Sequence, residues 1–258
     1  SAKDPTTGDD AALGILLQLW QSTVADRLQE TRSVLNTIRY LGPLRESPKR
    51  IEVRPPSGTR FVGAGGEDTS FLLYRDPQIT TEVNTWLKRL EVPYEIRVER
   101  LTPRGLSTVG EVLALVLRDS RTHTDVSPKD VGFGISQVLP VVTQCLASTR
   151  EVLLIEQPEI HLHPRLQANL ADLMILSVSD PRHNQVIAET HSEALLLRLQ
   201  RRIREGKIDP ELVRVLYVGN SQGVGSWIEE IPLGERGEFL EEWPHGFFEE
   251  RLDEITLP

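Results

Sequence analysis

The chain has 258 residues, of which 39% are hydrophobic and 26% are charged, a composition typical of an ordinary globular protein with one large domain or two small ones. Its net charge of −9 argues against a general affinity for nucleic acid, although a local basic patch remains compatible with it. A single cysteine, Cys145, excludes an internal disulfide framework and fits a reducing compartment. No apolar run approaches the roughly 20 residues of a membrane span, so we expect a cytoplasmic protein without a membrane segment.

The first half of the chain predicts one long helix followed by a mixed region. From Ala11 to Tyr40, apolar residues recur at steps of three, four or seven, which is typical of an amphipathic helix that packs on the domain or on a partner. Gly42-Pro43 would end that helix. Residues 50–73 are richer in Gly and Pro, and two runs within them, Pro55–Gly58 and Gly63–Gly66, are predicted turns or loops. The next predicted elements are a helix over Ile79–Leu90, strands over Tyr94–Leu101 and Val109–Leu117, and a polar loop over Arg118–Lys129.

Helices and strands alternate in the second half. The predicted helices are Ser136–Ser148, Pro164–Val178 and Ser192–Glu205, and the predicted strands are Val152–Ile155, Gln185–Ala188 and Val213–Val218. Such alternation predicts an α/β domain with a parallel sheet and right-handed crossovers. We expect three regions: residues 1–50 with the long helix and a linker, residues 51–130 as an insertion with mixed strands and a helix, and residues 131–258 as the α/β portion, which ends in a short aromatic helix over Trp243–Leu252.

Polar side chains follow two of the predicted strands at the point where each strand ends. The apolar run Val152–Ile155 leads directly into Glu-Gln-Pro-Glu-Ile-His-Leu-His-Pro, which begins at Glu156. Open α/β sheets bind ligands at this edge, and a carboxylate there can hold a hard cation such as Mg²⁺. His191 follows the next strand, where an imidazole can contact a phosphate or position a water molecule. The alternative for both residues is a purely structural contact.

A third segment, Gly132-Phe133-Gly134-Ile135-Ser136-Gln137, precedes an apolar helix. Two glycines permit a close backbone approach, and Ser136 could cap the helix. The free amides at a helix N-terminus attract anions. Taken alone, however, a Gly-rich segment before a helix is usually only a tight turn.

One basic cluster contrasts with the acidic composition of the chain. It comprises Arg198, Arg201, Arg202, Arg204 and Lys207, all near the end of the last predicted helix. Charge runs of this kind usually form a solvated helix face, so we interpret the cluster in that way and not as a DNA contact.

These three segments, in this order, resemble the C-terminal lobe of ABC-type ATPases of the SMC/RecF/OLD-like branch. The similarity is densest over Val131–Ile255, and Tyr40-Leu41-Gly42-Pro43-Leu44-Arg45 is also similar to that group. The resemblance implies a parallel-sheet P-loop NTPase fold with ATP and Mg²⁺ as cofactors. It also implies a head-to-head homodimer that holds two nucleotides between its subunits. A DNA-related or phage-defence role rests on the resemblance only.

The resemblance also implies roles for single residues. Glu156 takes the Walker B acidic position on the Mg²⁺ shell. Gly134 and Ser136, with the adjoining Gln137, take the signature position, which touches the γ-phosphate of a nucleotide held by the second subunit. The D-loop at the dimer interface contains His161 and His163, and the switch-histidine position is taken by His191.

The chain departs from the family pattern in two ways. The catalytic glutamate after the Walker B acid is replaced by Gln157, and an amide cannot take a proton from water. We therefore expect slow hydrolysis, in which Gln157, Glu159 or His191 orients the water. The second departure is that no Gly-x-x-x-x-Gly-Lys-Ser/Thr motif occurs in the sequence. We expect the P-loop portion to be supplied from outside this sequence, so that the chain alone binds ATP poorly.

Two other functions remain open. His161 and His163, with Glu156, Glu159, His191 and Glu193, could form the Zn²⁺ site of a metal-dependent hydrolase. Alternatively, the long helix and the acidic, aromatic C-terminus could belong to a non-catalytic interaction module.

Overall fold

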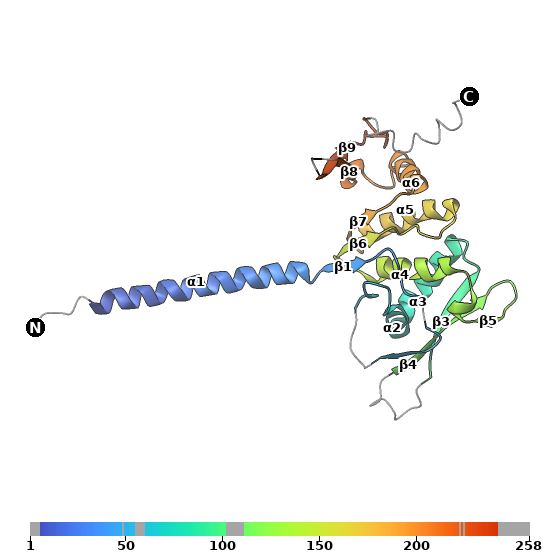
Figure 1. Ribbon diagram of the computed structural model, residues 1–258, viewed down its shortest axis with the longest axis horizontal. Coiled ribbons are helices and arrows are strands. Elements are labelled where there is room, and N and C mark those ends of the chain that lie inside the picture. Colours follow the sequence, from blue (N-terminus) through green and yellow to red (C-terminus); the bar gives the residue numbers. More distant parts are fainter. Residues whose placement is uncertain are drawn as a thin grey trace, which may run out of the picture. The chain divides into compact units, whose positions relative to one another are not determined.

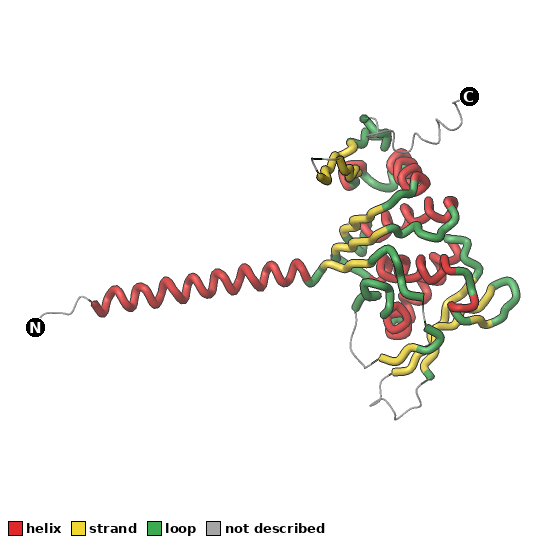
Figure 2. The backbone as a smooth tube through the Cα atoms, in the orientation of Figure 1, coloured by secondary structure: helices red, strands yellow, loops and turns green. Residues whose placement is uncertain are grey.

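The computed structural model describes residues 6–47, 49–54, 60–101, 111–221, 223 and 225–241 (Figure 2). The chain divides into two compact units, Ser1–Ile38 and Arg39–Pro258. The aromatic helix predicted over Trp243–Leu252 lies outside the described residues. No described helix combines the length and the apolar character that crossing a membrane requires.

The first unit contains one long helix, α1 (Thr6–Leu35; Figure 1). The predicted long helix is thus confirmed, but it begins and ends earlier than Ala11–Tyr40. The residues that follow form strand β1 (Ile38–Leu41), because this segment belongs to a sheet and not to the helix. The predicted apolar stripe is largely exposed where side chains are described, since Trp20, Leu28 and Leu35 are each at least 60% exposed.

An antiparallel sheet forms one part of the second unit. Its strands are β2 (Glu52–Arg54), β3 (Tyr94–Arg100), β4 (Glu111–Asp119) and β5 (Asp125–Val126), in the order β2-β4-β3, with β5 paired to β4. The N-cap of helix α3 (Pro77–Arg89) is Asp76, whose carboxylate accepts hydrogen bonds from the Gln78 and Ile79 backbone amides. The helix packs Val83, Trp86 and Leu87 into the core.

The region rich in Gly and Pro and the predicted polar loop both contain regular structure. Strand β2 and the start of helix α2 (Thr69–Arg75) lie within residues 50–73, and β5 and the start of a 3₁₀ turn (Pro128–Asp130) lie within residues 118–129. Strand β2 forms because it pairs with β4, with Glu52 opposite Leu113. Pairing between distant segments therefore overrides a local composition rich in Gly and Pro.

The parallel strands lie in a separate three-stranded sheet with the order β1-β6-β7. Strand β6 (Val152–Glu156) pairs in parallel with β7 (Gln185–Glu189), residue by residue from Val152 opposite Gln185 to Glu156 opposite Glu189. One face of this pair is packed, since Leu153 and Ile155 are at most 1% exposed. The opposite face is more open, and Ile187 on it is 53% exposed.

Helix α4 (Phe133–Ala147) is the centre of the core and lies between the parallel strands and the α2–α3 pair (Figure 1). Most of its described side chains are buried, the polar ones among them, such as Gln137 and Gln144. Helix α5 (Pro164–Val178) is the crossover between β6 and β7, and α6 (Glu193–Arg204) follows β7 and packs against α5. These three helices confirm the alternating pattern that the sequence predicted.

The strand predicted over Val213–Val218 is present, but the prediction that it joins the parallel sheet is wrong. Strand β8 (Val215–Ser221) pairs only with β9 (Gly225–Ile231) among the described strands, and the two form an antiparallel hairpin. The turn contains Gly223 and Gly225, which both have positive φ angles, a conformation that glycine adopts without strain. Across the hairpin the Trp227 ring covers Gly219, where a Cβ would lie only 2.4 Å from the ring.

Candidate functional site

The carboxylates of Glu156 and Glu189 end two neighbouring parallel strands. They are register partners on β6 and β7, so both side chains project from the same, more open face of the sheet. The Tyr40 hydroxyl on β1 donates a hydrogen bond of 3.0 Å to Glu156 Oε1. That bond raises the pKa of Tyr40, and the charges of Glu156 and Glu189 add to the effect. The predicted convergence of polar groups at this edge is therefore present.

Gln157 adopts a left-handed backbone conformation with φ 44° directly after β6. Its backbone N–H donates to the Glu189 backbone carbonyl at 2.8 Å, and its backbone carbonyl accepts from the Ile160 N–H at 3.2 Å. Such a φ angle is unfavourable for a residue with a side chain, by about 1–2 kcal/mol. Backbone contacts on both sides thus hold Gln157 in a conformation that it would not adopt alone, and its side chain stays partly exposed.

Glu159 is buried and bonds the loop that follows β7. Its Oε1 accepts a hydrogen bond of 2.7 Å from the backbone amide of His191, while Oε2 is buried without a hydrogen-bond partner among the described residues. The His191 side chain is 65% exposed, and its Nε2 lies 3.9 Å from Glu189 Oε1. The structure therefore brings together Glu156, Gln157, Glu159 and His191 on two adjacent loops.

The two histidines of the predicted D-loop differ in their local roles. His163 precedes α5 as its N-cap, and its Nδ1 accepts from the Arg165 amide at 3.3 Å. His161 has a φ angle of 62° and an exposed side chain. Gln167 of α5 fixes the loop between them, because its Nε2 donates to the Leu162 carbonyl at 3.0 Å. Their predicted contact with a cofactor or a second subunit stays a prediction.

The predicted signature segment lies against the same loop. A Cβ on Gly134 would lie 3.0 Å from the His161 carbonyl oxygen, so glycine permits the close approach of α4 to that loop. The prediction that Ser136 caps the helix is wrong. The N-cap is Gly132, because the helix begins at Phe133 and encloses Ser136 in its first turn, where Ser136 is 3% exposed.

Gln137 is fully buried and has a structural contact. Its Oε1 accepts from the Arg45 amide at 3.1 Å, and its Nε2 donates to the Arg45 carbonyl at 2.9 Å. The amide of Gln137 thus pairs with the main chain of Arg45 in the way that a neighbouring strand would. Its predicted part in cofactor binding stays a prediction.

Sequence reasoning missed Arg45 as a site residue, although it closes the Tyr40–Arg45 segment that marked the family resemblance. Arg45 is 2% exposed, and its guanidinium donates to the carbonyls of Glu156 at 2.6 Å and of Gln157 at 3.2 Å. Burial lowers the pKa of Arg45 to about 10, and the nearby charges of Glu159 and Glu156 oppose that shift. The only local signal was an arginine two residues after a Gly-Pro pair, which does not identify its distant partners.

The residues at the strand ends fit Mg²⁺ better than Zn²⁺. Glu156 and Glu189 offer partly exposed carboxylate oxygens on one face, and Mg²⁺ is commonly held by one or two carboxylates together with phosphate oxygens. Among the described residues, no group of three or more His, Cys, Asp or Glu side chains could hold a metal ion. The zinc cluster that His161, His163 and the surrounding carboxylates might have formed is therefore not assembled.

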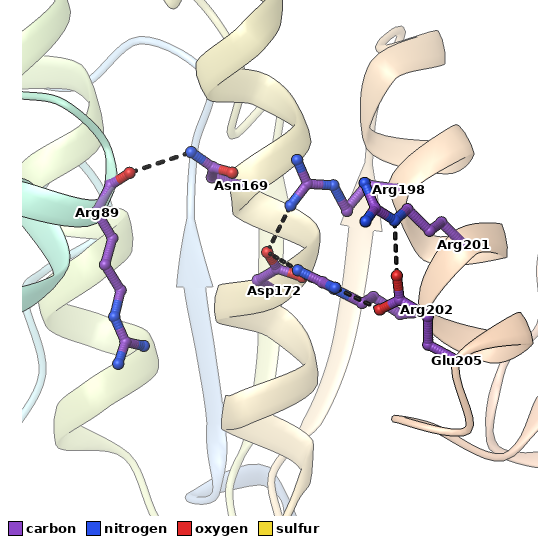
Figure 3. A network of polar contacts seen from close by, with 7 residues as sticks. All are labelled: Arg89, Asn169, Asp172, Arg198, Arg201, Arg202 and Glu205. Atoms are coloured by element: carbon purple, nitrogen blue, oxygen red, sulfur yellow. Dashed lines mark hydrogen bonds and ion pairs between the residues drawn. The ribbon is translucent and has the colours of Figure 1, made fainter.

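The basic cluster on α6 is more than a solvated face. Figure 3 shows Arg198 and Arg202 both directed at Asp172 of α5, to which they donate at 2.8 and 2.9 Å. Their side chains are less than a quarter exposed. Arg201 pairs with Glu205 at 2.7 Å and remains 61% exposed. Asp172 and Glu205 thus pair with three of the five cations of the cluster, and the pairs with Asp172 join α5 to α6.

The family model described as "AAA domain, putative AbiEii toxin, Type IV TA system" matches residues 21–198, which is more than half of the chain. The comparison with curated proteins gave no match.

Several solved structures of SMC head domains are similar to the chain. One is an SMC head bound to the C-terminal winged-helix domain of ScpA, with 14% identity and a TM-score of 0.47 over 70% of this chain and 57% of that one. A second comes from a study of ATP-driven dimerisation and DNA-stimulated activation of SMC ATPases, with 13% identity and a TM-score of 0.44 over 74% of this chain and 98% of that one.

A third structure is the Smc head domain with a coiled coil and joint from Pyrococcus yayanosii, with 13% identity and a TM-score of 0.45. This alignment covers 62% of this chain and 28% of that one, so the chain spans only part of the length of the first and third structures.

The extent of the family match and the α/β architecture with a parallel strand pair together confirm the predicted AAA/ABC-type ATPase fold. By the match over residues 21–198, the chain belongs to the family described as "AAA domain, putative AbiEii toxin, Type IV TA system".

Proposed function

We propose that the chain is part of an ATP-binding and ATP-hydrolysing module of the ABC type. The observation that carries this proposal is the meeting of Glu156, Gln157 and His191 at the ends of β6 and β7. Ligands bind at this edge of open α/β sheets, and the family is one of AAA domains. The proposal is supported further by the low burial of this face relative to the packed face of the same strands.

In this proposal, Glu156 holds Mg²⁺ directly or through water, with Glu189 beside it on the same face. Bound Mg²⁺ would neutralise charge on the phosphates of ATP. Tyr40 orients the Glu156 carboxylate through its 3.0 Å hydrogen bond. Glu159 fixes the backbone at His191, so that the exposed imidazole stays beside Glu189.

Gln157 takes the place of the usual catalytic glutamate. Its amide can donate and accept hydrogen bonds and so orient a water molecule, as a glutamine does in some GTPases. It cannot remove a proton, and positioned general bases contribute about 10²–10⁴-fold in rate. We therefore expect slow hydrolysis and a long-lived ATP-bound state.

The chain contains no Gly-x-x-x-x-Gly-Lys-Ser/Thr motif, so we propose that the grip on the α- and β-phosphates comes from a polypeptide segment outside this sequence. Gly134, His161 and His163 would face ATP in a homodimer, whereas Ser136 is 3% exposed and would need a shift of the first turn of α4 to reach it. A role in DNA-related processes or in defence is part of the proposal, and the description of the family as a toxin of a type IV toxin–antitoxin system is compatible with it.

The test is a Mg-dependent ATPase assay on the protein purified from its natural source, with the 258-residue chain assayed in parallel. Gln157→Glu should raise turnover about tenfold or more, because it restores a carboxylate base. Glu156→Gln should abolish turnover while the protein stays folded. Wild-type turnover that Gln157→Glu leaves unchanged would remove the proposed role of Gln157. Absence of ATP binding and hydrolysis in every sample would favour a non-catalytic interaction module.

A further inference from the structure

We propose that Arg45 is a positioning residue that holds Glu156 and Gln157 in place through their carbonyl oxygens and does not itself contact the nucleotide. This inference rests on the proposed function, because it assigns the support of the same site. It concerns the one segment of the family resemblance, Tyr40–Arg45, to which the resemblance gave no role.

The guanidinium of Arg45 spans two successive carbonyls at the end of β6. One nitrogen, Nη2, donates to the Glu156 carbonyl at 2.6 Å, and Nη1 donates to the Gln157 carbonyl at 3.2 Å. A planar guanidinium has a fixed fork of donors that can bond two acceptors at once, which an ammonium cannot do. The contact therefore fixes the direction of the chain as it leaves the strand.

Arg45 is itself held rigidly. The Gln137 side chain bonds both the amide and the carbonyl of Arg45, at 3.1 and 2.9 Å, and Gln137 is fully buried in α4. The same helix places Gly134 against the His161 carbonyl, at the far end of the loop that Gln157 begins. Arg45 thus connects α4, which carries the predicted signature residues, to the strand end that carries Glu156.

The loop needs such support because Gln157 has a φ angle of 44°, which glycine adopts easily and glutamine does not. The Gln157 amide is fixed by the Glu189 carbonyl, and the Gln157 carbonyl by Ile160 and Arg45. Removal of Arg45 would leave Gln157 bonded to Glu189 and Ile160 only. The residue proposed to orient water would then be free to change its backbone conformation.

Direct contact between Arg45 and phosphate is incompatible with its surroundings. The residue is 2% exposed, and two of its terminal nitrogens already bond main-chain oxygens. The guanidinium stays charged at neutral pH, since burial lowers its pKa only to about 10. Its Nε has no hydrogen-bond partner among the described residues. A buried charge without complete pairing is costly, which argues for a positioning role over simple space filling.

The first measurement is amide hydrogen exchange on the 258-residue chain and its Arg45→Met variant, which keeps the volume and loses the fork. Exchange at Gln157–Leu162 should become about tenfold faster or more, because each bond to a charged donor contributes that much protection. Arg45→Lys, the second variant in case the methionine protein does not fold, should give a smaller increase. Arg39→Met is the control, because Arg39 pairs with Glu151 before β6 begins, and it should leave these amides unchanged.

The second measurement is steady-state ATP hydrolysis by the natural-source protein carrying the same substitutions. Arg45→Lys should lower kcat about tenfold with the KM for ATP nearly unchanged, since misplaced groups weaken the transition state and not the bound ground state. Unchanged exchange at Gln157–Leu162 in a folded Arg45 variant would overturn the inference and leave the proposed ATPase intact. Equal losses in kcat and affinity would also overturn it. Faster exchange in a protein without any ATPase activity would instead refute the proposed function alone.

Discussion

The Glu159 carboxylate accepts a hydrogen bond of 2.7 Å from the backbone amide of His191, so the loop after β6 is tied to the loop after β7. Glu159 is 7% exposed, and its second oxygen is buried. The sequence predicted that Glu159 could orient water in the absence of a catalytic glutamate. Its geometry favours a role one step away, in which it sets the position of His191, and direct action on water stays a prediction.

Removal of the Glu159 carboxylate should loosen the link between these two loops. Glu159→Ala should lower the free energy of unfolding by about 1.5–3 kcal/mol, the range for a hydrogen bond to a charged group. Glu159→Gln should cost less, because its amide oxygen can still accept from His191. Urea unfolding followed by circular dichroism measures both. Equal losses in the two variants would show that the bond to His191 contributes little and that charge or volume matters instead.

Gly134 should tolerate no side chain, whereas Gly132 should. A Cβ on Gly134 would lie 3.0 Å from the His161 carbonyl, while a Cβ on Gly132 would meet nothing within 4 Å. We expect Gly134→Ala to lower the free energy of unfolding by about 1–2 kcal/mol, typical of overpacking, in spite of the better helix propensity of alanine. Gly132→Ala, its control, avoids this clash and should cost only the penalty of alanine at an N-cap, about 0.5 kcal/mol. Thermal unfolding of both variants checks this, and a neutral Gly134→Ala would mean that the His161 loop yields freely.

The elements that could be predicted from the sequence are those with strong local patterns. The apolar run before Glu156 predicted a strand buried on both faces, and the strand is present with one buried face. The Leu- and Ala-rich segment after His163 predicted α5 with the bounds that the structure has. Local periodicity is sufficient there because each element contacts the core over its whole length.

The wrong predictions share a physical cause. Strand β8 reads as one more parallel strand, but its partner is decided by the turn at Gly223 and Gly225, which returns the chain into an antiparallel hairpin. Ser136 has the chemistry of a cap, but the helix starts three residues earlier. Arg45 was missed because its partners are more than 90 residues away in the chain. Contacts over such distances leave no local pattern.

Asp172 should be the residue on which the contact between α5 and α6 depends most. Arg198 and Arg202 both donate to it, and the pairing raises the pKa of Arg202. Asp172→Asn should lower the free energy of unfolding by about 1–3 kcal/mol, because it removes the counter-charge of the partly buried Arg198 and leaves Arg202 paired with Glu205 alone among the described residues. The exposed Arg201 is the control, and Arg201→Ala should cost about 0.5 kcal/mol or less. Urea unfolding at low and high salt measures both, and a salt-independent, small loss at Asp172 would contradict the prediction.

Cys145 should be unreactive in the folded protein and should make its stability depend on pH in alkaline solution. Burial raises the pKa of its thiol from 9.0 to about 12. Below pH 9 the thiol is protonated in both states, so its contribution to stability is constant. Between pH 9 and 12 it ionises in the unfolded chain only, which lowers the free energy of unfolding as pH rises.

Two measurements check this. The first is a thiol-reagent assay at pH 8, with and without denaturant. The second is a set of unfolding curves between pH 8 and 11, a range that includes the thiol pKa of the unfolded chain and stays below that of the folded protein. The folded wild-type chain should show almost no reaction, and the denatured chain should react with one equivalent of reagent. Cys145→Ala should lose less stability than the wild type between pH 9 and 11, because lysine and tyrosine ionisation is common to both proteins. Rapid modification of the folded chain would show that the core around α4 opens, and parallel stability curves would show that the thiol stays protonated in both states.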